Sequence, residues 1–172
     1  MPVSLYELSV PNYLQILGGV AVTMDKGAEF AAESGLDLEQ LVDYRLRDDM
    51  LPFSFQVISV WHHSLGAIRG LKAGLFQPPP NLGPQSYEQL RGLVTEATRE
   101  LTSLSPDEVN ALEDKAMMFK MGKVEIPFTA TSFVQSFSQP NFYFHAATTY
   151  DVLRLHGVPL GKMDFLGAMR IG

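Results

Sequence analysis

The most informative stretch of this sequence is the segment from Gln139 to Gly157, which reads QPNFYFHAATTYDVLRLHG. Its apolar and aromatic residues recur at helical rather than alternating spacing, and Gly157 followed by Pro159 is a helix stop. Asn141 and His145 are four residues apart, so a helix presents both side chains on one face. The segment therefore predicts a helix that carries an amide and an imidazole toward hydrogen-bonding partners in a core.

Pro140 predicts a disturbance inside this helix if the helix begins near Thr129 or Thr131. Proline has no N–H to donate to the carbonyl of Ser136, so we expect a kink just before Asn141.

The composition describes an ordinary folded protein. The 172 residues are enough for one domain, 1–172, with a hydrophobic core, and 46% are hydrophobic and 19% charged. The net charge of −6 argues against a nucleic-acid partner and against an anionic membrane surface.

The absence of cysteine excludes disulfides, thiolate metal sites and a cysteine nucleophile. Without a signal-peptide pattern or an apolar run of membrane-spanning length, a cytoplasmic protein is expected.

Hydrophobic periodicity predicts long helices over 5–34, 53–73, 87–101 and 131–156. Pro11 is expected to set a short turn apart from the first helix, and Gly18-Gly19 to allow close packing. A short helix is expected after Asp37. The proline-rich run 77–84 predicts a loop, and alternation over 116–128 around Met121-Gly122-Lys123 predicts a β-hairpin. The tail, 158–172, is expected to pack over one bundle end. The chain is therefore predicted to be all-α, a four-helix bundle with a small β-hairpin before the last helix.

His63 is the candidate site residue of the second long helix. Its neighbours at helical spacing, Gln56, Ser59, Ala67 and Gly70, are small or polar, which leaves room around the imidazole. Such space beside a polar group is typical of a pocket wall, and close helix packing is the alternative interpretation. His62 points about 100° away on an α-helix and His156 lies about 16 Å from His145 along the axis, so both are interpreted as surface or helix-end residues.

Several blocks resemble the DinB-like (YfiT-like) superfamily of helical-bundle metalloenzymes. These are SLYELSVP at 4–11, PNFYFH at 140–145, GVPLGK at 157–162 and DFLG at 164–167. The resemblance covers nearly the whole chain and is closer to a family of unknown function found in bacteria and fungi. It implies an antiparallel up-down-down-up bundle that is commonly a homodimer.

The resemblance also implies a divalent metal, Zn, Ni or Fe, held by one histidine of the second helix and a His-x-x-x-His pair of the last. His63 and His145 match two of these ligands, whereas Asn141 stands at the first position of the pair. A neutral amide oxygen is a poor ligand for such ions, so a metal site of His63 and His145 is incomplete.

Our first hypothesis is a small-molecule enzyme with its site in the bundle core. His63 and His145 act in it as general acid and base or as ligands of a weakly held ion, and Asn141 orients the substrate. Trp61, Phe137 and Tyr143 bind an apolar or aromatic substrate. Isomerase, cyclase, dehydratase and thiol-dependent transferase chemistry all fit. The alternatives are a non-catalytic ligand-binding dimer and a purely structural interaction domain.

Overall fold

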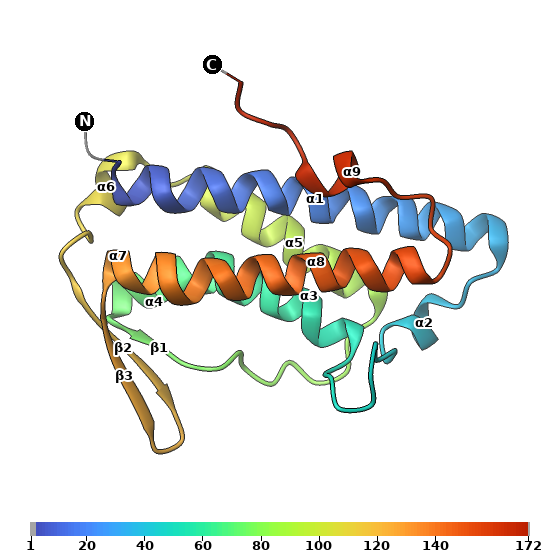
Figure 1. The fold of residues 1–172 in the computed structure, drawn as a ribbon, viewed down its shortest axis with the longest axis horizontal. Helices are drawn as coiled ribbons and strands as arrows, with labels where there is room; N and C mark the ends of the chain where they lie inside the picture. Colours follow the sequence, from blue (N-terminus) through green and yellow to red (C-terminus); the bar gives the residue numbers. More distant parts are fainter. Residues whose placement is uncertain (1–2, 172) are drawn as a thin grey trace.

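The computed structural model describes residues 3–171 and is mostly helical, with a small sheet at one end (Figure 1). The elements follow in the order α1 (Leu5–Ser34), α2 (Leu38–Leu41), α3 (Phe53–Trp61), η1 (His62–Gly66), α4 (Ala67–Ala73), β1 (Leu75–Phe76), α5 (Tyr87–Thr102), α6 (Pro106–Asn110), β2 (Ala116–Met121), β3 (Val124–Thr129), α7 (Ala130–Phe133), η2 (Val134–Ser138), α8 (Gln139–Leu155) and α9 (Lys162–Leu166). No helix in this part of the chain has the length and hydropathy needed to cross a membrane.

The long helices share one core. α1 packs against α5 and α8, and α3 packs against the same two helices. Side chains from all of these elements are fully buried between them, among them Tyr13, Phe53, Leu90 and Phe142. The core therefore runs along the length of the helices, and side chains that face it from α3 and α8 meet inside the molecule.

α1 is one continuous helix of 30 residues with Pro11 inside it. The prediction of a separate turn before Pro11 is wrong. The helix starts instead at Ser4, whose side chain accepts from the Glu7 N–H while the Glu7 carboxylate accepts from Ser4 N–H. This capping box, together with the burial of Leu5 and Val10, holds the first turns in helical geometry despite the proline.

The second and last long helices each contain a π-helical turn. The second runs as α3, η1 and α4, and the last as α7, η2 and α8. η2 ends at Ser138, two residues before Pro140, and the N–H of Gln139 bonds to Val134 O. The disturbance predicted before Asn141 is therefore a wider turn of helix, which accommodates a residue that cannot donate an N–H.

The predicted hairpin is confirmed. β2 and β3 pair antiparallel, with Met121 opposite Val124, and Gly122 turns the chain at a φ of 60°. A third strand was not predicted: β1 pairs parallel to β2, with Phe76 opposite Phe119. This strand has two residues, too few for alternation to be recognised in a sequence. It brings Phe76, which is buried, onto the second long helix.

The C-terminal segment lies along α1, not over a bundle end as predicted (Figure 1). Lys26 pairs with Asp164 at 2.8 Å, and Gln15 Nε2 donates to Leu166 O at 3.0 Å. Gly19 allows this approach, since a Cβ placed there would lie 2.2 Å from Phe165 O. The predicted close packing at Gly18-Gly19 is thus confirmed at Gly19, where the partner is α9.

Gly19→Ala is expected to lower the free energy of unfolding by about 1–3 kcal/mol, the usual cost of overpacking. The added Cβ meets backbone atoms, which cannot rotate away as a side chain can. Gly18→Ala is the matched control, because no atom of residues 3–171 lies within 4 Å of a Cβ placed there and alanine favours helix. Urea unfolding of both variants checks the prediction; equal stabilities would contradict it.

Candidate functional site

The structure brings His63 and His145 together. His63 comes from η1 and His145 from α8, and their imidazole centroids lie 6.0 Å apart with the planes inclined by 17°. The two rings therefore form a stacked pair between the second and last long helices. This is the pairing that the sequence predicted.

The His145 ring is held by a side chain of α3. His145 Nδ1 lies 2.7 Å from Gln56 Oε1, and Gln56 Nε2 in turn donates to Leu51 O at 2.8 Å. Because the Gln56 amide already uses its nitrogen as the donor, its oxygen accepts and Nδ1 of His145 carries the proton. The Nε2 of a neutral His145 therefore keeps its lone pair. Burial lowers the pKa of His145 to about 4, so the ring is neutral at pH 7.

His63 is the more enclosed of the two histidines, at 7% exposed. Its Nδ1 is buried and has no hydrogen-bond partner among residues 3–171. Burial, together with smaller contributions from repulsion by charge on His62 and His145, lowers the pKa of His63 to about 3. A buried polar atom without a protein partner is uncommon in folded proteins, and a water molecule, an ion or a ligand can satisfy it.

A buried chain of hydrogen bonds holds the backbone of His63. Ser138 Oγ of η2 donates to His63 O at 2.6 Å, and the Tyr13 hydroxyl lies 2.8 Å from the same Oγ. Since Ser138 uses its single proton for His63, Tyr13 is the donor to Ser138. Burial raises the pKa of Tyr13, so its hydroxyl keeps the proton that it donates. The two π turns thus meet at this contact, and α1 supports them.

Aromatic rings surround the histidine pair. Phe76 and Phe137 lie 5.3 and 5.7 Å from the His63 ring, and Phe55 and Phe144 lie 5.9 and 5.2 Å from the His145 ring. Phe137 is therefore where the sequence prediction placed it. Phe76, Phe55 and the support from Gln56 were missed as parts of the site. Gln56 carried a usable signal, because it lies two helical turns before His63 on the same face.

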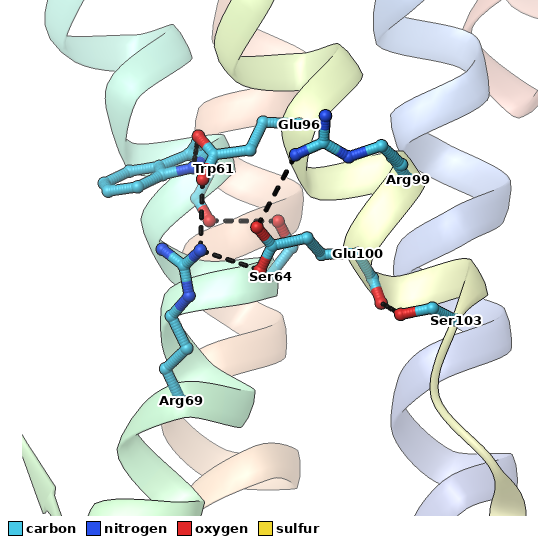
Figure 2. Close-up of polar contacts among 7 residues, drawn as sticks. All are labelled: Trp61, Ser64, Arg69, Glu96, Arg99, Glu100 and Ser103. Atoms are coloured by element: carbon cyan, nitrogen blue, oxygen red, sulfur yellow. Dashed lines mark hydrogen bonds and ion pairs between the residues drawn. The ribbon is translucent and has the colours of Figure 1, made fainter.

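Other predicted members of the site lie elsewhere. Asn141 Nδ2 donates to Phe137 O at 2.7 Å within its own helix, and no hydrogen bond joins it to either histidine of the pair. Tyr143 is 38% exposed and packs on Phe142. Trp61 points to α5, where its Nε1 donates to Glu96 Oε2 at 3.2 Å (Figure 2). These predicted roles in the histidine site are therefore not matched by the geometry.

His62 is not a surface residue, as the sequence interpretation had it. It is 9% exposed, its ring stacks on Phe76 at 4.3 Å, and its centroid lies 5.7 Å from that of His63. Its Nε2 donates to Gln77 O at 2.7 Å. The interpretation assumed an α-helix and an open outer face, whereas His62 begins a π turn and β1 covers it. Burial lowers the pKa of His62, against the effect of its bond to Gln77.

The residues present do not complete a metal site. Two imidazoles that share a zinc ion have ring centres about 5–6.5 Å apart, given Zn–N bonds of about 2.0–2.1 Å, and the 6.0 Å here falls in that range. However, residues 3–171 contain no group of three or more His, Asp or Glu side chains placed to hold an ion. Zinc sites in proteins normally use at least three protein ligands, so this donor set is one short.

The helical fold is that of a DinB-like protein. The chain resembles the crystal structure of a DinB family member from Shewanella denitrificans, with a TM-score of 0.79 and 25% identity over 98% of this chain and 94% of that one. The profile of the family described as "Domain of unknown function (DUF1993)" matches residues 5–166. The chain belongs to that family. No curated protein matches it.

Proposed function

We propose that the chain is a small-molecule enzyme whose site is the stacked pair of His63 and His145. The observation that carries this proposal is the pair itself: two neutral imidazoles stacked with centroids 6.0 Å apart, one oriented by Gln56 and the other with a buried Nδ1 that has no partner in the described part of the chain. Structural histidines in a core have their nitrogens satisfied, so the free Nδ1 argues against a purely structural role.

The geometry favours proton-transfer chemistry. The Nε2 lone pair of His145 accepts a proton from the substrate, and Gln56 stabilises the resulting imidazolium through Nδ1–H. A base with a pKa near 4 gives its proton up again readily. Such a site suits reactions that move a proton within one substrate, as in isomerisation, cyclisation or dehydration. The phenylalanine rings around the pair favour an apolar or aromatic substrate.

A second candidate is a non-catalytic ligand-binding homodimer with an incomplete metal site. The low pKa of both histidines favours it, because neither ring is a strong base or a populated acid at pH 7. A thiol-dependent transferase remains a third proposal; the thiol would come from a cosubstrate, since the chain has no cysteine.

Hydrogen exchange of a neutral aromatic ketone tests the first candidate. Phenylacetone in D₂O is followed by NMR for loss of its α-protons. The wild-type protein is expected to accelerate this exchange, and His145→Ala and Gln56→Leu to lose the acceleration, by roughly 10²-fold for a general base. His156→Ala is the matched control, because it removes a histidine of the same chain at the end of α8. Acceleration that persists in His145→Ala would contradict the proposal.

The same sample separates the alternatives. Shifts of the His63 and His145 NMR signals without proton exchange would support the non-catalytic binding protein. Elemental analysis of the untagged protein tests the metal: about one Zn, Ni or Fe per chain, lost in His63→Ala, would establish a site that the donor set alone does not complete. If neither signal shifts and no ion is bound, the histidine pair is not the site.

We also infer that the long helices form an antiparallel up-down-down-up bundle. In Figure 1, α1 and α8 run away from the end where α6 and α7 lie, and α3–α4 and α5 run back toward it. The contacts of α1 and α3 with both α5 and α8 support this arrangement. The linker after β1 would then return along the bundle so that α5 starts at the same end as α3.

A further inference from the structure

A groove that neither His63 nor His145 lines has Phe76 in its wall. Residues of α3, η1 and α4 form one wall, and the segment from Leu75 to Pro80 forms the other. Its volume is about 540 Å³, within the range of small-molecule sites. His62 lines this groove, and the Phe76 ring stacks on it at 4.3 Å while lying 5.3 Å from His63.

His62 offers the groove a hydrogen-bond acceptor. A carbonyl cannot donate, so the 2.7 Å contact with Gln77 O places the ring proton on Nε2 and leaves the lone pair on Nδ1. That nitrogen faces Gly66: a Cβ on Gly66 would lie 2.8 Å from it. Glycine at this position therefore leaves space next to the acceptor. Stacking on Phe76 and the bond to Gln77 prevent the ring from turning away.

The groove wall contributed by Trp61 is aromatic and held in place. Trp61 Nε1 donates to Glu96, and the Arg69 guanidinium lies 6.0 Å from the centre of the Trp61 rings. Gly66, Gly70 and Ala73 of the same wall have little or no side chain, whereas Arg69 of this wall lies over the Trp61 rings. Trp61 is 9% exposed, so a planar molecule can lie on the small residues and meet only the exposed part of the indole.

Arg69 does not make this groove a site for anions. Its guanidinium bonds to Glu96 at 3.0 Å and to Glu100 at 2.7 Å, and Arg99 lies 3.7 Å from Glu100 (Figure 2). Two carboxylates of the protein therefore already pair with Nη2 of Arg69 and balance its charge. A ligand carboxylate would have to compete with them and would be repelled by their charge.

We propose that this groove binds a neutral, planar aromatic molecule that lies on Gly66, Gly70 and Ala73 beside Trp61 and donates one hydrogen bond, from O–H or N–H, to Nδ1 of His62. The site is distinct from the stacked pair of His63 and His145, and it does not depend on any catalytic role of that pair.

Three probes of similar size test the proposal: phenol, which donates a hydrogen bond; anisole, which cannot; and benzoate, which is an anion. Trp61 is the only tryptophan, so its fluorescence reports on the groove, and the ring signals of His62 follow the acceptor by NMR. Phenol is expected to bind about 3- to 10-fold more tightly than anisole, as one hydrogen bond allows, and benzoate to bind most weakly. Equal affinity for phenol and anisole, the tightest binding for benzoate, or no binding of phenol would overturn the proposal.

Two variants locate the bound phenol. Gly66→Ala places a methyl group against His62 Nδ1 and is expected to abolish the preference for phenol over anisole. Gly92→Ala on α5 is the matched control, since its Cβ has nothing within 4 Å, and it should leave binding unchanged. If Gly66→Ala does not fold, His62→Phe replaces it. This variant keeps an aromatic ring on Phe76 but removes the acceptor nitrogen, so it should also abolish the preference for phenol over anisole. If phenol shifts the NMR signals of His145 but not those of His62, then it binds at the histidine pair, and the proposal of a binding site in the groove is overturned.

Discussion

Acidification from pH 6.5 to pH 4 is expected to lower the free energy of unfolding steeply, because the fold keeps His63 and His145 neutral. Their folded-state pKa values, about 3 and about 4, lie below the ordinary value of 6.5 that applies in the unfolded chain. In this window the unfolded chain binds protons that the folded chain does not. Stability present above pH 6.5 is therefore lost as the pH falls, by up to about 1.4 kcal/mol per pH unit for each histidine.

Urea unfolding at a series of pH values measures how the free energy of unfolding depends on pH. Carboxylates titrate in the same range, so a variant is needed to separate the contribution of the two histidines. The double variant His63→Gln, His145→Gln should show a weaker dependence of the free energy of unfolding on pH. His156→Gln, which removes one histidine and leaves the pair intact, is the control. If the difference in stability between wild type and the double variant does not change between pH 6.5 and pH 4, the two rings are not kept neutral by burial.

Ser138→Ala is expected to lower the free energy of unfolding by about 1–3 kcal/mol, the cost of leaving buried polar groups without partners. Ser138 is fully buried and bonds to both the Tyr13 hydroxyl and His63 O. The substitution leaves both of those groups unpaired where water does not reach. Because His63 O belongs to a π turn, the NMR signals of the His63 ring should also shift.

Ser136→Ala is the matched control for this prediction. Ser136 belongs to the same π turn, but it is exposed and bonds only within its own helix, to Ser132 O. Its loss should change stability by less than about 0.5 kcal/mol. Tyr13→Phe combined with Ser138→Ala should cost less than the sum of the two single changes, since the hydroxyl left unpaired in Ser138→Ala is then absent. Equal effects at positions 136 and 138 would contradict the role of the buried chain.

The long helices could be predicted because their signals are local. The bounds of α1, Leu5 and Ser34, agree with the prediction, since a capping box starts the helix and Gly35 ends it in the left-handed conformation, with a φ of 77°. α5 also begins at the predicted residue, Tyr87, after a capping box on Ser86, and it ends at Thr102, one residue beyond the prediction. The hairpin was equally visible, through alternation on both sides of Gly122.

The details of the site were less predictable because they depend on contacts between distant segments. The interpretation of His62 as a surface residue failed since β1, which covers it, pairs with a strand more than 40 residues away. Trp61 was predicted to bind substrate beside the histidines, but it turns to Glu96 on α5. Asn141 was predicted to belong to the site because of its spacing to His145, but its amide instead donates a hydrogen bond within its own helix.

The sequence by itself determined the helices and the hairpin, because periodicity, caps and turn residues act over a few neighbouring positions. It also singled out His63 and His145, through the small or polar neighbours of His63 and the resemblance to the superfamily. Only the tertiary structure decided how these histidines behave. The contact of Gln56 with His145, the Tyr13–Ser138–His63 chain and the cover of Phe76 over His62 all join residues from different elements. Burial among such partners sets the proton positions and lowers the pKa values of the rings, and no spacing along the chain encodes it.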